Sequence, residues 1–337
     1  APVIAGTPAA ITYTCAGDVP AGDIASVTAT DNCVGAVTVT VADVTIPGTC
    51  PNNYTITRTW TATDVCGNTS SSNQTITVND NVAPVIAGTP AAITYTCGGD
   101  VPVADIASVT ATDNCAGAVT VTVADVTVPG TCPNNYTITR TWTATDLCGN
   151  VASSNQTITV NDNIAPTADP LAAIGPFSCF ADIPAANIAD VTGATDNCGG
   201  VVTVAFVSDN ASGGCSGSVI RTYSLTDVCG NVSTVTQNIT VNDNTPPTIT
   251  GTPAAITYTC AGDVPAGDIA SVTATDNCAG AVTVTVADVT VPGTCPNNYT
   301  ITRTWTATDA CANVATSSQT ITVNDNVAPV IAGTPAA

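Results

Sequence analysis

Hydrophobic and polar residues alternate with a period of two over long stretches of the chain. Val37, Val39 and Val41 alternate with threonines, and residues 54–62 carry threonine at every second position. Alternation of this kind is typical of strands that bury one face. Proline, glycine, aspartate and asparagine cluster between the runs, as at 17–23 and 78–84, and mark turns. No window shows helical periodicity, so the pattern predicts an all-β fold.

The spacing of turns suits a small immunoglobulin-like sandwich. In the first part of the chain we expect strands near residues 11–15, 27–30, 37–44, 54–64 and 75–78, with a short strand at 3–5. The expected architecture is a tandem array of small Ig-like β-sandwich domains, each with two disulfides.

The array is indicated by sixteen cysteines that fall in four groups of four and recur about every 82 residues. Self-similarity at a fixed period means that each unit is a small domain and that the function belongs to the array. We expect repeats at 1–82, 83–164, 165–245 and 246–327, with the third divergent and 328–337 starting the next. Residues 328–337 repeat residues 1–10 and methionine is absent, so we expect a window from a longer array.

Charge excludes several classes of partner. The chain has 25 acidic residues, all aspartate, and 4 basic residues, all arginine, giving a formal net charge of −21. Such a chain repels nucleic acid and anionic lipid. No apolar run approaches the roughly 18 residues that a membrane-spanning helix needs. We therefore expect no nucleic acid partner and no membrane insertion in this segment.

The cysteines favour disulfides over zinc. Zinc sites usually contain closely spaced cysteine pairs, whereas successive cysteines of the first repeat lie 16 to 18 residues apart. Small units with thin cores commonly rely on disulfides, which require an oxidising compartment. This predicts an extracellular, secreted protein in which each bridge adds about 3 kcal/mol to its repeat.

Strand order predicts which cysteines pair. Consecutive antiparallel strands place successive loops at opposite ends of a sandwich, so Cys33 and Cys66 share one end, and Cys15 and Cys50 share the other. Of three pairings within a repeat, first with third and second with fourth is favoured. The predicted pairs are Cys15 with Cys50, Cys33 with Cys66, Cys97 with Cys132, Cys115 with Cys148, Cys179 with Cys215, Cys198 with Cys229, Cys260 with Cys295, and Cys278 with Cys311.

Several motifs resemble a known family. TDNC, GTC, YTITRTWTATDxCGN and a closing QTITVNDN recur along the chain, and they resemble the HYR-like (hyalin-repeat-like) domains with four cysteines. The third repeat departs most, with Tyr223 in place of the tryptophan. The resemblance implies Ig-like modules in long arrays of very large secreted surface proteins of Bacteroidetes-type bacteria, including cell-surface adhesins.

Missing residues argue against catalysis. Histidine, lysine and glutamate are absent, so a Ser-His-Asp set cannot form, and bridged cysteines leave no thiol nucleophile. Every repeat carries the same aspartates, as a structural role would require. We expect no enzyme.

Calcium is the candidate cofactor. Aspartates recur near the expected domain ends, Ca²⁺ prefers six to eight such oxygens, and the string VNDNVAP is similar to the calcium-binding linker of cadherins. The alternative is that these side chains cap their own loops in Asx turns. The candidate ligands are Asp31, Asp64, Asp80, Asp113, Asp146, Asp162, Asp196, Asp227, Asp243, Asp276, Asp309 and Asp325.

Each repeat has one arginine at an inward position of a predicted strand: Arg58, Arg140, Arg221 and Arg303. A charge there needs a partner. Stacking on Trp60 or Tyr54 with a hydrogen bond to an aspartate or a loop carbonyl would supply one. We favour this structural role over a ligand-binding arginine.

The sequence favours a structural function, as spacer, stalk or fibre-forming repeats of a giant extracellular cell-surface adhesin or filament. The expected partners are neighbouring repeats of the same chain, with lateral self-association into fibres as a further candidate. Like charge along the array opposes collapse. The alternative is an adhesive module whose repeats bind a glycan or a surface multivalently.

Overall fold

The structure, a computed structural model, describes residues 1–333. It divides into two compact units, Ala1–Ile164 and a second that begins at Ala165. Each unit contains two of the repeats expected from the sequence. The predicted all-β class with tandem Ig-like sandwiches is confirmed. Among the described residues, no helix is long and apolar enough to span a bilayer.

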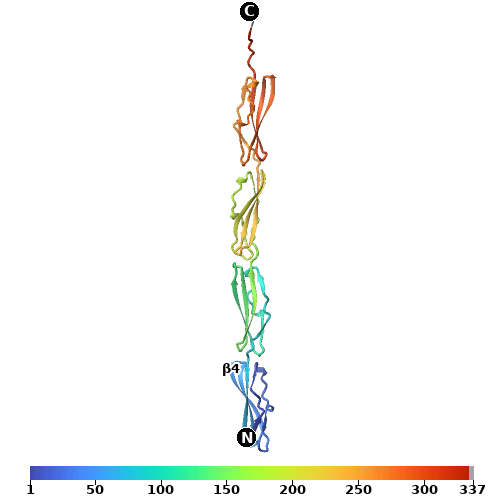
Figure 1. The fold of residues 1–337 in the computed structure, drawn as a ribbon, viewed down its shortest axis with the longest axis vertical. Coiled ribbons are helices and arrows are strands. Elements are labelled where there is room, and N and C mark those ends of the chain that lie inside the picture. Colours follow the sequence, from blue (N-terminus) through green and yellow to red (C-terminus); the bar gives the residue numbers. More distant parts are fainter. Residues whose placement is uncertain (334–337) are drawn as a thin grey trace. The chain divides into compact units, whose positions relative to one another are not determined.

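The first repeat shows the plan of the sandwich (Figure 1). Its strands are β1 (Val3–Ala5), β2 (Ile11–Tyr13), β3 (Thr28–Thr30), β4 (Thr38–Cys50), β5 (Asn53–Thr63) and β6 (Thr69–Asn79). β1 and β3 form a two-stranded antiparallel sheet. The other four form a sheet in the order β2-β6-β5-β4, in which β2 lies parallel to β6 and the remaining pairs are antiparallel.

The same plan recurs in the other repeats. The second contains β7 (Val85–Ala87), β8 (Ile93–Tyr95), β9 (Thr110–Thr112), β10 (Thr120–Pro129), β11 (Asn135–Thr145) and β12 (Val151–Asn161). The third contains β13 (Ile174–Phe177), β14 (Thr203–Gly213), β15 (Ser216–Thr226) and β16 (Val232–Asn242). The fourth contains β17 (Thr248–Thr250), β18 (Ile256–Tyr258), β19 (Thr273–Thr275), β20 (Thr283–Cys295), β21 (Asn298–Thr308) and β22 (Val314–Asn324).

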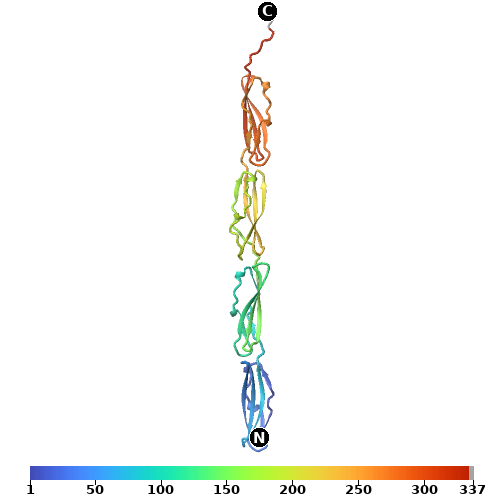
Figure 2. The same ribbon diagram turned by 90° about the vertical axis from the view of Figure 1, so that its left-hand side faces the viewer.

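Alternation along the long strands builds the core. In β5, Trp60 and Ala62 are almost fully buried, and in β6 the same holds for Ile76 and Val78, while the intervening threonines lie on the other face. The segment with the short strands runs along one side of the long strands (Figure 2). One buried face per strand is what the period-two pattern predicts.

The strands differ from expectation mainly in length. β4 continues through Cys50, and β6 begins at Thr69, well before the expected 75–78. Both extensions follow from pairing, because β5 pairs with β4 from Tyr54 onward and with β6 along its whole length. Two 3-10 turns, Ala16–Asp18 and Ile24–Ser26, also lie in the first repeat.

The third repeat keeps the sheet with a different core. Tyr223 takes the tryptophan's position, is fully buried, and packs edge-on against Phe206 with ring centroids 6.2 Å apart. Its hydroxyl accepts a hydrogen bond from the backbone N–H of Asn187. In place of the small two-stranded sheet, a single bridge pairs Thr167 with Thr195.

Candidate functional site at the repeat junctions

Disulfides join neighbouring repeats in the first unit. Cys15 and Cys50 of the first repeat bond to Cys115 and Cys148 of the second, with Cα atoms 5.1 Å apart in both bridges. The first cysteine of one repeat thus pairs with the second of the next, and the third pairs with the fourth.

The second unit follows the same rule. Cys179 bonds to Cys278 and Cys215 bonds to Cys311, over sequence separations of 99 and 96 residues. Cys97, Cys132, Cys198 and Cys229 are disulfide-bonded as well. The same pairing in two units of different sequence makes it a property of the repeat.

The predicted pairing within a repeat is therefore wrong for every cysteine whose partner is described. Cys15 does not bond Cys50, Cys115 does not bond Cys148, and the same correction applies to the predicted pairs Cys179–Cys215 and Cys278–Cys311. Cys15 and Cys50 do lie at the same end of the sandwich, as strand order predicts, but both bond to cysteines of the next repeat instead of to each other.

Four cysteines expected in bridges are free thiols. Cys33 and Cys66 of the first repeat and Cys260 and Cys295 of the fourth are all exposed, so the predicted pairs Cys33–Cys66 and Cys260–Cys295 are also wrong. By position they are the second and fourth cysteines of one repeat and the first and third of another.

Carboxylates converge beside the bridges of the first junction. Carboxylate oxygens of Asp80 and Asp113 and the sulfur of Cys115 lie within 4.8 Å of one another. A cavity of about 10 Å³ is lined by Asp80, Asp113, Asp146 and Asn52, which is room for one ion or water. The Cys115 sulfur is in a bridge and offers no thiolate, so the candidate ligands are oxygens.

One oxygen in this cluster has no partner. Asp113 Oδ2 accepts the backbone N–H of Cys115 at 2.9 Å, while its buried Oδ1 lacks a hydrogen bond. Asp146 uses both oxygens for its own loop, accepting from the backbone N–H of Cys148 and from the backbone and side chain of Asn150. Capping of its own loop therefore accounts for both carboxylate oxygens of Asp146, but for only one of the two oxygens of Asp113.

The second unit repeats the cluster with two unpartnered oxygens. Asp243 Oδ1 accepts from the backbone N–H of Thr245, and Asp276 Oδ2 accepts from that of Cys278. The remaining oxygens, Asp243 Oδ2 and Asp276 Oδ1, are buried without a partner. Asp243 is only 5% exposed, and a cavity of about 10 Å³ lined by Asp243, Asp276 and Asp309 contains the site.

The electrostatics of the first junction also favour a bound cation. Burial raises the pKa of Asp80, and the nearby carboxylates of Asp113 and Asp146 raise it further against one backbone hydrogen bond. Burial also raises the pKa of Asp146, but hydrogen bonds from Asn150, Cys148 and Gly149 outweigh it, so its net pKa is lowered. Asp80 is the carboxylate for which a cation would most relieve repulsion.

The other predicted ligands lie away from these two clusters. Asp31 and Asp64 line the exposed end of the first repeat, and Asp325 is exposed at the end of the fourth. Asp162 is buried after β12, and Asp227 is buried in the third repeat, where Asp196 is half-buried.

Three asparagines that were not among the predicted site residues complete the two junctions. Asn150 Nδ2 donates to the backbone carbonyl of Asp80 at 3.2 Å, and Asn313 Nδ2 donates to that of Asp243 at 3.0 Å. Asn52 is 6% exposed and accepts from the backbone N–H of Ala16. Their recurrence as CGN, CAN and CPNN was the available signal.

The arginines lie inside the repeats, away from the junctions. Arg58 is 4% exposed, and its Nε and Nη2 donate to the two oxygens of Asp43 on β4 at 2.8 Å each. Nη2 also donates to the carbonyl of Pro20 at 2.7 Å. The Arg58 hydrogen bonds lower the pKa of Asp43, and the carboxylate raises that of Arg58.

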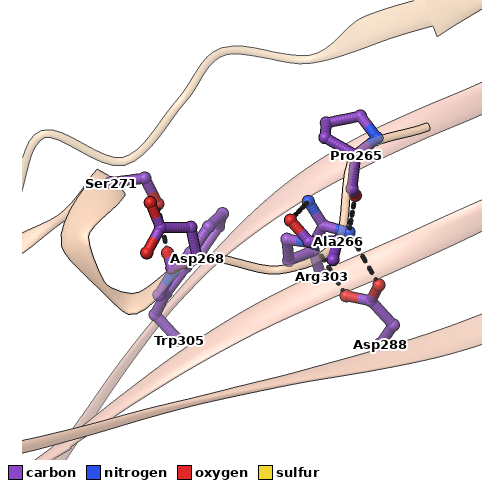
Figure 3. Close-up of polar contacts among 7 residues, drawn as sticks. All are labelled: Pro265, Ala266, Asp268, Ser271, Asp288, Arg303 and Trp305. Atoms are coloured by element: carbon purple, nitrogen blue, oxygen red, sulfur yellow. Dashed lines mark hydrogen bonds and ion pairs between the residues drawn. The ribbon is translucent and has the colours of Figure 1, made fainter. Parts of the chain in front are cut away.

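Figure 3 shows the same arrangement in the fourth repeat. Arg303 donates to both oxygens of Asp288 and to the carbonyl of Pro265. Trp305, two residues along β21, donates its indole N–H to the carbonyl of Asp268 at 2.9 Å. Arg140 and Arg221 form equivalent pairs with Asp125 and Asp209. Each guanidinium ties a long strand to the segment that crosses the sheet.

Comparison with known families decides the membership. The model of the HYR-like domain with 4 cysteines matches residues 3–78, 85–160 and 172–241. The chain belongs to this family. No curated protein matches its sequence.

Solved structures similar to these HYR-like repeats include cadherin ectodomains. A protocadherin gammaB7 EC3-6 cis-dimer structure is 14% identical with a TM-score of 0.36, covering 95% of this chain and 100% of the other. Extracellular cadherin domains 3-6 of protocadherin gamma B2 are 14% identical with a TM-score of 0.33, covering 97% and 100%.

Proposed function

We propose that these HYR-like repeats are a non-enzymatic structural spacer whose joints are cross-linked, part of a secreted array at a bacterial cell surface. The supporting observation is that the described disulfides run between successive repeats. Each such junction is crossed three times by covalent bonds, once by the linker and twice by bridges. Bending, twisting and separation of the two sandwiches are all restricted, which is what a spacer requires.

The bridges also limit how far the chain lengthens under tension. In the first unit, Cys15–Cys115 takes the residues between the two cysteines, a separation of 100, out of the path of force. At a maximum of about 3.3–3.6 Å per residue, this withholds roughly 340 Å of extension even when both sandwiches unfold. An array built this way keeps its length when single repeats open.

Single-molecule force extension of the whole chain tests the proposal. With bridges intact, the extension gained on unfolding should be shorter by several hundred ångströms than after reduction, because reduction releases the sequestered residues. Equal extension in both states would contradict the spacer.

The multivalent adhesive module remains the competing function. Deleting one whole repeat should shorten a spacer without changing adhesion of the assembly that carries it. A stepwise fall in adhesion with each deleted repeat would favour the binder.

We further propose that the junction clusters bind calcium, on the support of Asp113 Oδ1, Asp243 Oδ2 and Asp276 Oδ1, which are buried without a hydrogen-bond partner. An unpaired buried carboxylate oxygen is costly, and a cation offsets that cost. The protein supplies fewer oxygens than the six to eight that Ca²⁺ takes, so water would complete the shell.

Calorimetric titration with Ca²⁺ tests this site, with Asp276→Asn as the junction variant. The matched control is Asp31→Asn, the equivalent position at the exposed end of the first repeat, where Oδ1 is likewise buried without a hydrogen bond but no described carboxylate of another repeat lies beside it. Loss of one binding event in Asp276→Asn alone is expected, and identical titrations for both variants and the parent chain would contradict a junction site.

We propose that chains associate laterally through the edge strand β4 and its equivalents. Val44 and Ile46 are 62% and 58% exposed there, and Val126, Val128, Val289 and Val291 are similarly exposed on β10 and β20. Exposed apolar residues on an edge strand favour pairing with another chain. Sedimentation should show less association when these six residues become threonine, and unchanged association would exclude this edge.

A further inference from the structure

The junction inside the second unit contains a cavity of about 310 Å³. Both bridges of that junction line it, Cys179–Cys278 and Cys215–Cys311. We propose that this cavity binds a small organic ammonium ion, an apolar body that carries one positively charged nitrogen, and that Asp243 holds the nitrogen. This is a ligand site in addition to the spacer function and does not depend on it.

The wall of the cavity is mostly apolar and encloses one carboxylate. Val241 and Asp243 are 3% and 5% exposed and form its inner part. Phe180, Ala279 and Ala310 are exposed, so the cavity opens to solvent on their side. Among the described residues that line it, Asp243 is the only one that carries a charge. An apolar hollow of this volume, with one polar group that fixes orientation, is typical of small-molecule sites.

The carboxylate of Asp243 has one oxygen free for a ligand. Oδ1 accepts the backbone N–H of Thr245 at 3.1 Å, whereas Oδ2 is buried and has no hydrogen-bond partner. Each of the four arginines pairs with an aspartate of its own repeat, and the chain has no lysine or histidine. No basic side chain of the protein is therefore left for Oδ2, and a cation that donates a hydrogen bond would offset the cost of burying it.

A shorter loop in the third repeat makes room for the cavity. In the first repeat, Pro51 and Asn52 stand between Cys50 and the start of β5, whereas β15 begins directly after Cys215. The third repeat therefore has no counterpart of Asn52. The backbone closes the gap, because the N–H of Asp243 donates to the carbonyl of Cys215 itself at 2.9 Å.

The first junction has larger side chains at the equivalent places. Asn52 is 6% exposed there, and its side chain accepts the backbone N–H of Ala16 at 3.2 Å, so it fills the space between the two loops. Leu147 of the first junction is replaced by the smaller Ala310 in the second. The two junctions share their bridges and aspartates but differ in the room beside them.

The charge and the size of the cavity select the ligand class. A chain of net charge −21 attracts cations and repels anions, and the free oxygen of Asp243 accepts a hydrogen bond. The rest of the ligand must be apolar to match Val241 and the disulfides. A lysine side chain has only a four-carbon stem and would leave most of the cavity empty. A free amine with a ring system fits better.

Asp243 also belongs to the proposed calcium cluster. Calcium and an ammonium ion would exclude each other at Oδ2, so the ligand has to be tested with calcium removed. In the presence of a chelator, failure of the ammonium ion to bind leaves the calcium proposal untouched, and the two proposals are judged separately.

The test is calorimetric titration of the full chain with 2-naphthylmethylammonium in a buffer that contains a calcium chelator. The neutral control ligand is 2-naphthylmethanol, which has the same ring and one donor but no charge. We expect one site, at which the ammonium ion binds about tenfold more tightly than the alcohol because its hydrogen bond to Asp243 is charge-assisted. Methyl NMR signals of Val241 and Ala310 should shift on binding.

Three results would overturn the proposal. They are the absence of binding, equal affinity for the ammonium ion and the alcohol, and binding that leaves the signals of Val241 and Ala310 unchanged. Nα-acetyl-lysine amide should bind more weakly than the naphthyl amine. Equal or tighter binding of the lysine derivative would reject the small-molecule ligand and assign the site to a lysine of a partner protein.

Two variants locate the site. Asp243→Asn keeps the shape of the side chain and should abolish the tenfold preference for the ammonium ion. Asp263→Asn, at an exposed position of the same unit, removes the same charge and should leave the preference intact. If the preference survives in Asp243→Asn, or falls equally in both, Asp243 does not hold the nitrogen.

A second variant tests the cavity without touching the carboxylate. Gly214→Thr with Ala310→Leu introduces the residues of the first junction, Thr49 and Leu147, which the fold accepts there. Both substituted positions line the cavity, so the ammonium ion and the alcohol should each bind more weakly. Unchanged affinity for both ligands would place the binding elsewhere. Circular dichroism checks that each variant folds.

Discussion

The interior of a repeat and its ends are stabilised in different ways. Inside the first repeat, Arg58 donates hydrogen bonds to Asp43 and to the carbonyl of Pro20, and Trp60 donates one to the carbonyl of Asp23. At the end of the same repeat, Cys15 forms its disulfide with a cysteine of the next repeat. The interior is thus complete within about 80 residues, and the ends are complete only in an array.

This contrast reassigns the role of the disulfides. Bridges within a repeat would support a thin core, but no described bridge closes such a loop. The core is instead supported by a buried arginine paired with a partly exposed aspartate, and by a large aromatic ring two residues further along the strand. The bridges set how neighbouring repeats are held.

Removing one bridge gives the largest expected effect. Cys15→Ser with Cys115→Ser should lower the free energy of unfolding of the two-repeat unit by about 4 to 5 kcal/mol, because the closed loop is near 100 residues. The amides in the middle of β5 should remain as well protected from hydrogen exchange, relative to the rest of the unit, as they are in the parent chain. Urea unfolding and exchange measure the two quantities, and a selective loss of protection in β5 would show that the bridge does support the core.

Replacing the buried Arg58 should destabilise the core of one repeat and leave the junction bridges intact. Arg58→Ala strands Asp43, whose side chain is 34% exposed, so we expect a loss of about 2 to 3 kcal/mol, below the cost of breaking a fully buried pair. Faster exchange should be confined to the first repeat. Thr59→Ala, on the outer face of β5, is the matched control with an expected change within about 0.5 kcal/mol. Similar losses for both would place Arg58 outside the core's support.

Acidification should change the stability of the repeat interior and the stability of the junction in opposite directions. The pKa values of Asp43, Asp125 and Asp288 are lowered by their arginines, so the stability they contribute is present above about pH 4 and is lost as the pH falls through the depressed values. The pKa of Asp80 is raised, so protonation as the pH falls toward 4 favours the folded junction and relieves its repulsion.

Exchange at the junction and in the core, followed from pH 6 to pH 2 without calcium, checks both signs. Asp80→Asn should remove the pH-dependent change at the junction and leave the pH-dependent loss of protection in the core. A junction that loosens steadily from pH 6 downward would contradict the repulsion inferred at Asp80.

The same contrast explains what the sequence could predict. Alternation predicts the strands and their buried face, because Trp60 and Ile76 occupy positions set by the backbone's period. The inward position of Arg58 likewise indicates its need for a partner. The pairing of Cys15 could not follow from one repeat, since its partner is about 100 residues away and belongs to another sandwich. Because the repeats are nearly identical, every candidate partner cysteine recurs in each of them. The sequence pattern is therefore the same for a bridge within one repeat and for a bridge between neighbouring repeats.

The smallest effect isolates the junction itself. Asn150 donates to Asp146 in its own loop and also to the carbonyl of Asp80 in the preceding repeat. Asn68 occupies the same position in the first repeat and makes the equivalent bond to Asp64, and among the described residues it makes no hydrogen bond to another repeat. Both Asn→Ala variants lose the loop bond, so the difference between them is the bond across the junction, worth about 1 kcal/mol. Urea unfolding of both variants measures it. Equal losses would mean that the bridges alone hold the repeats together and that the asparagine contributes only to its own turn.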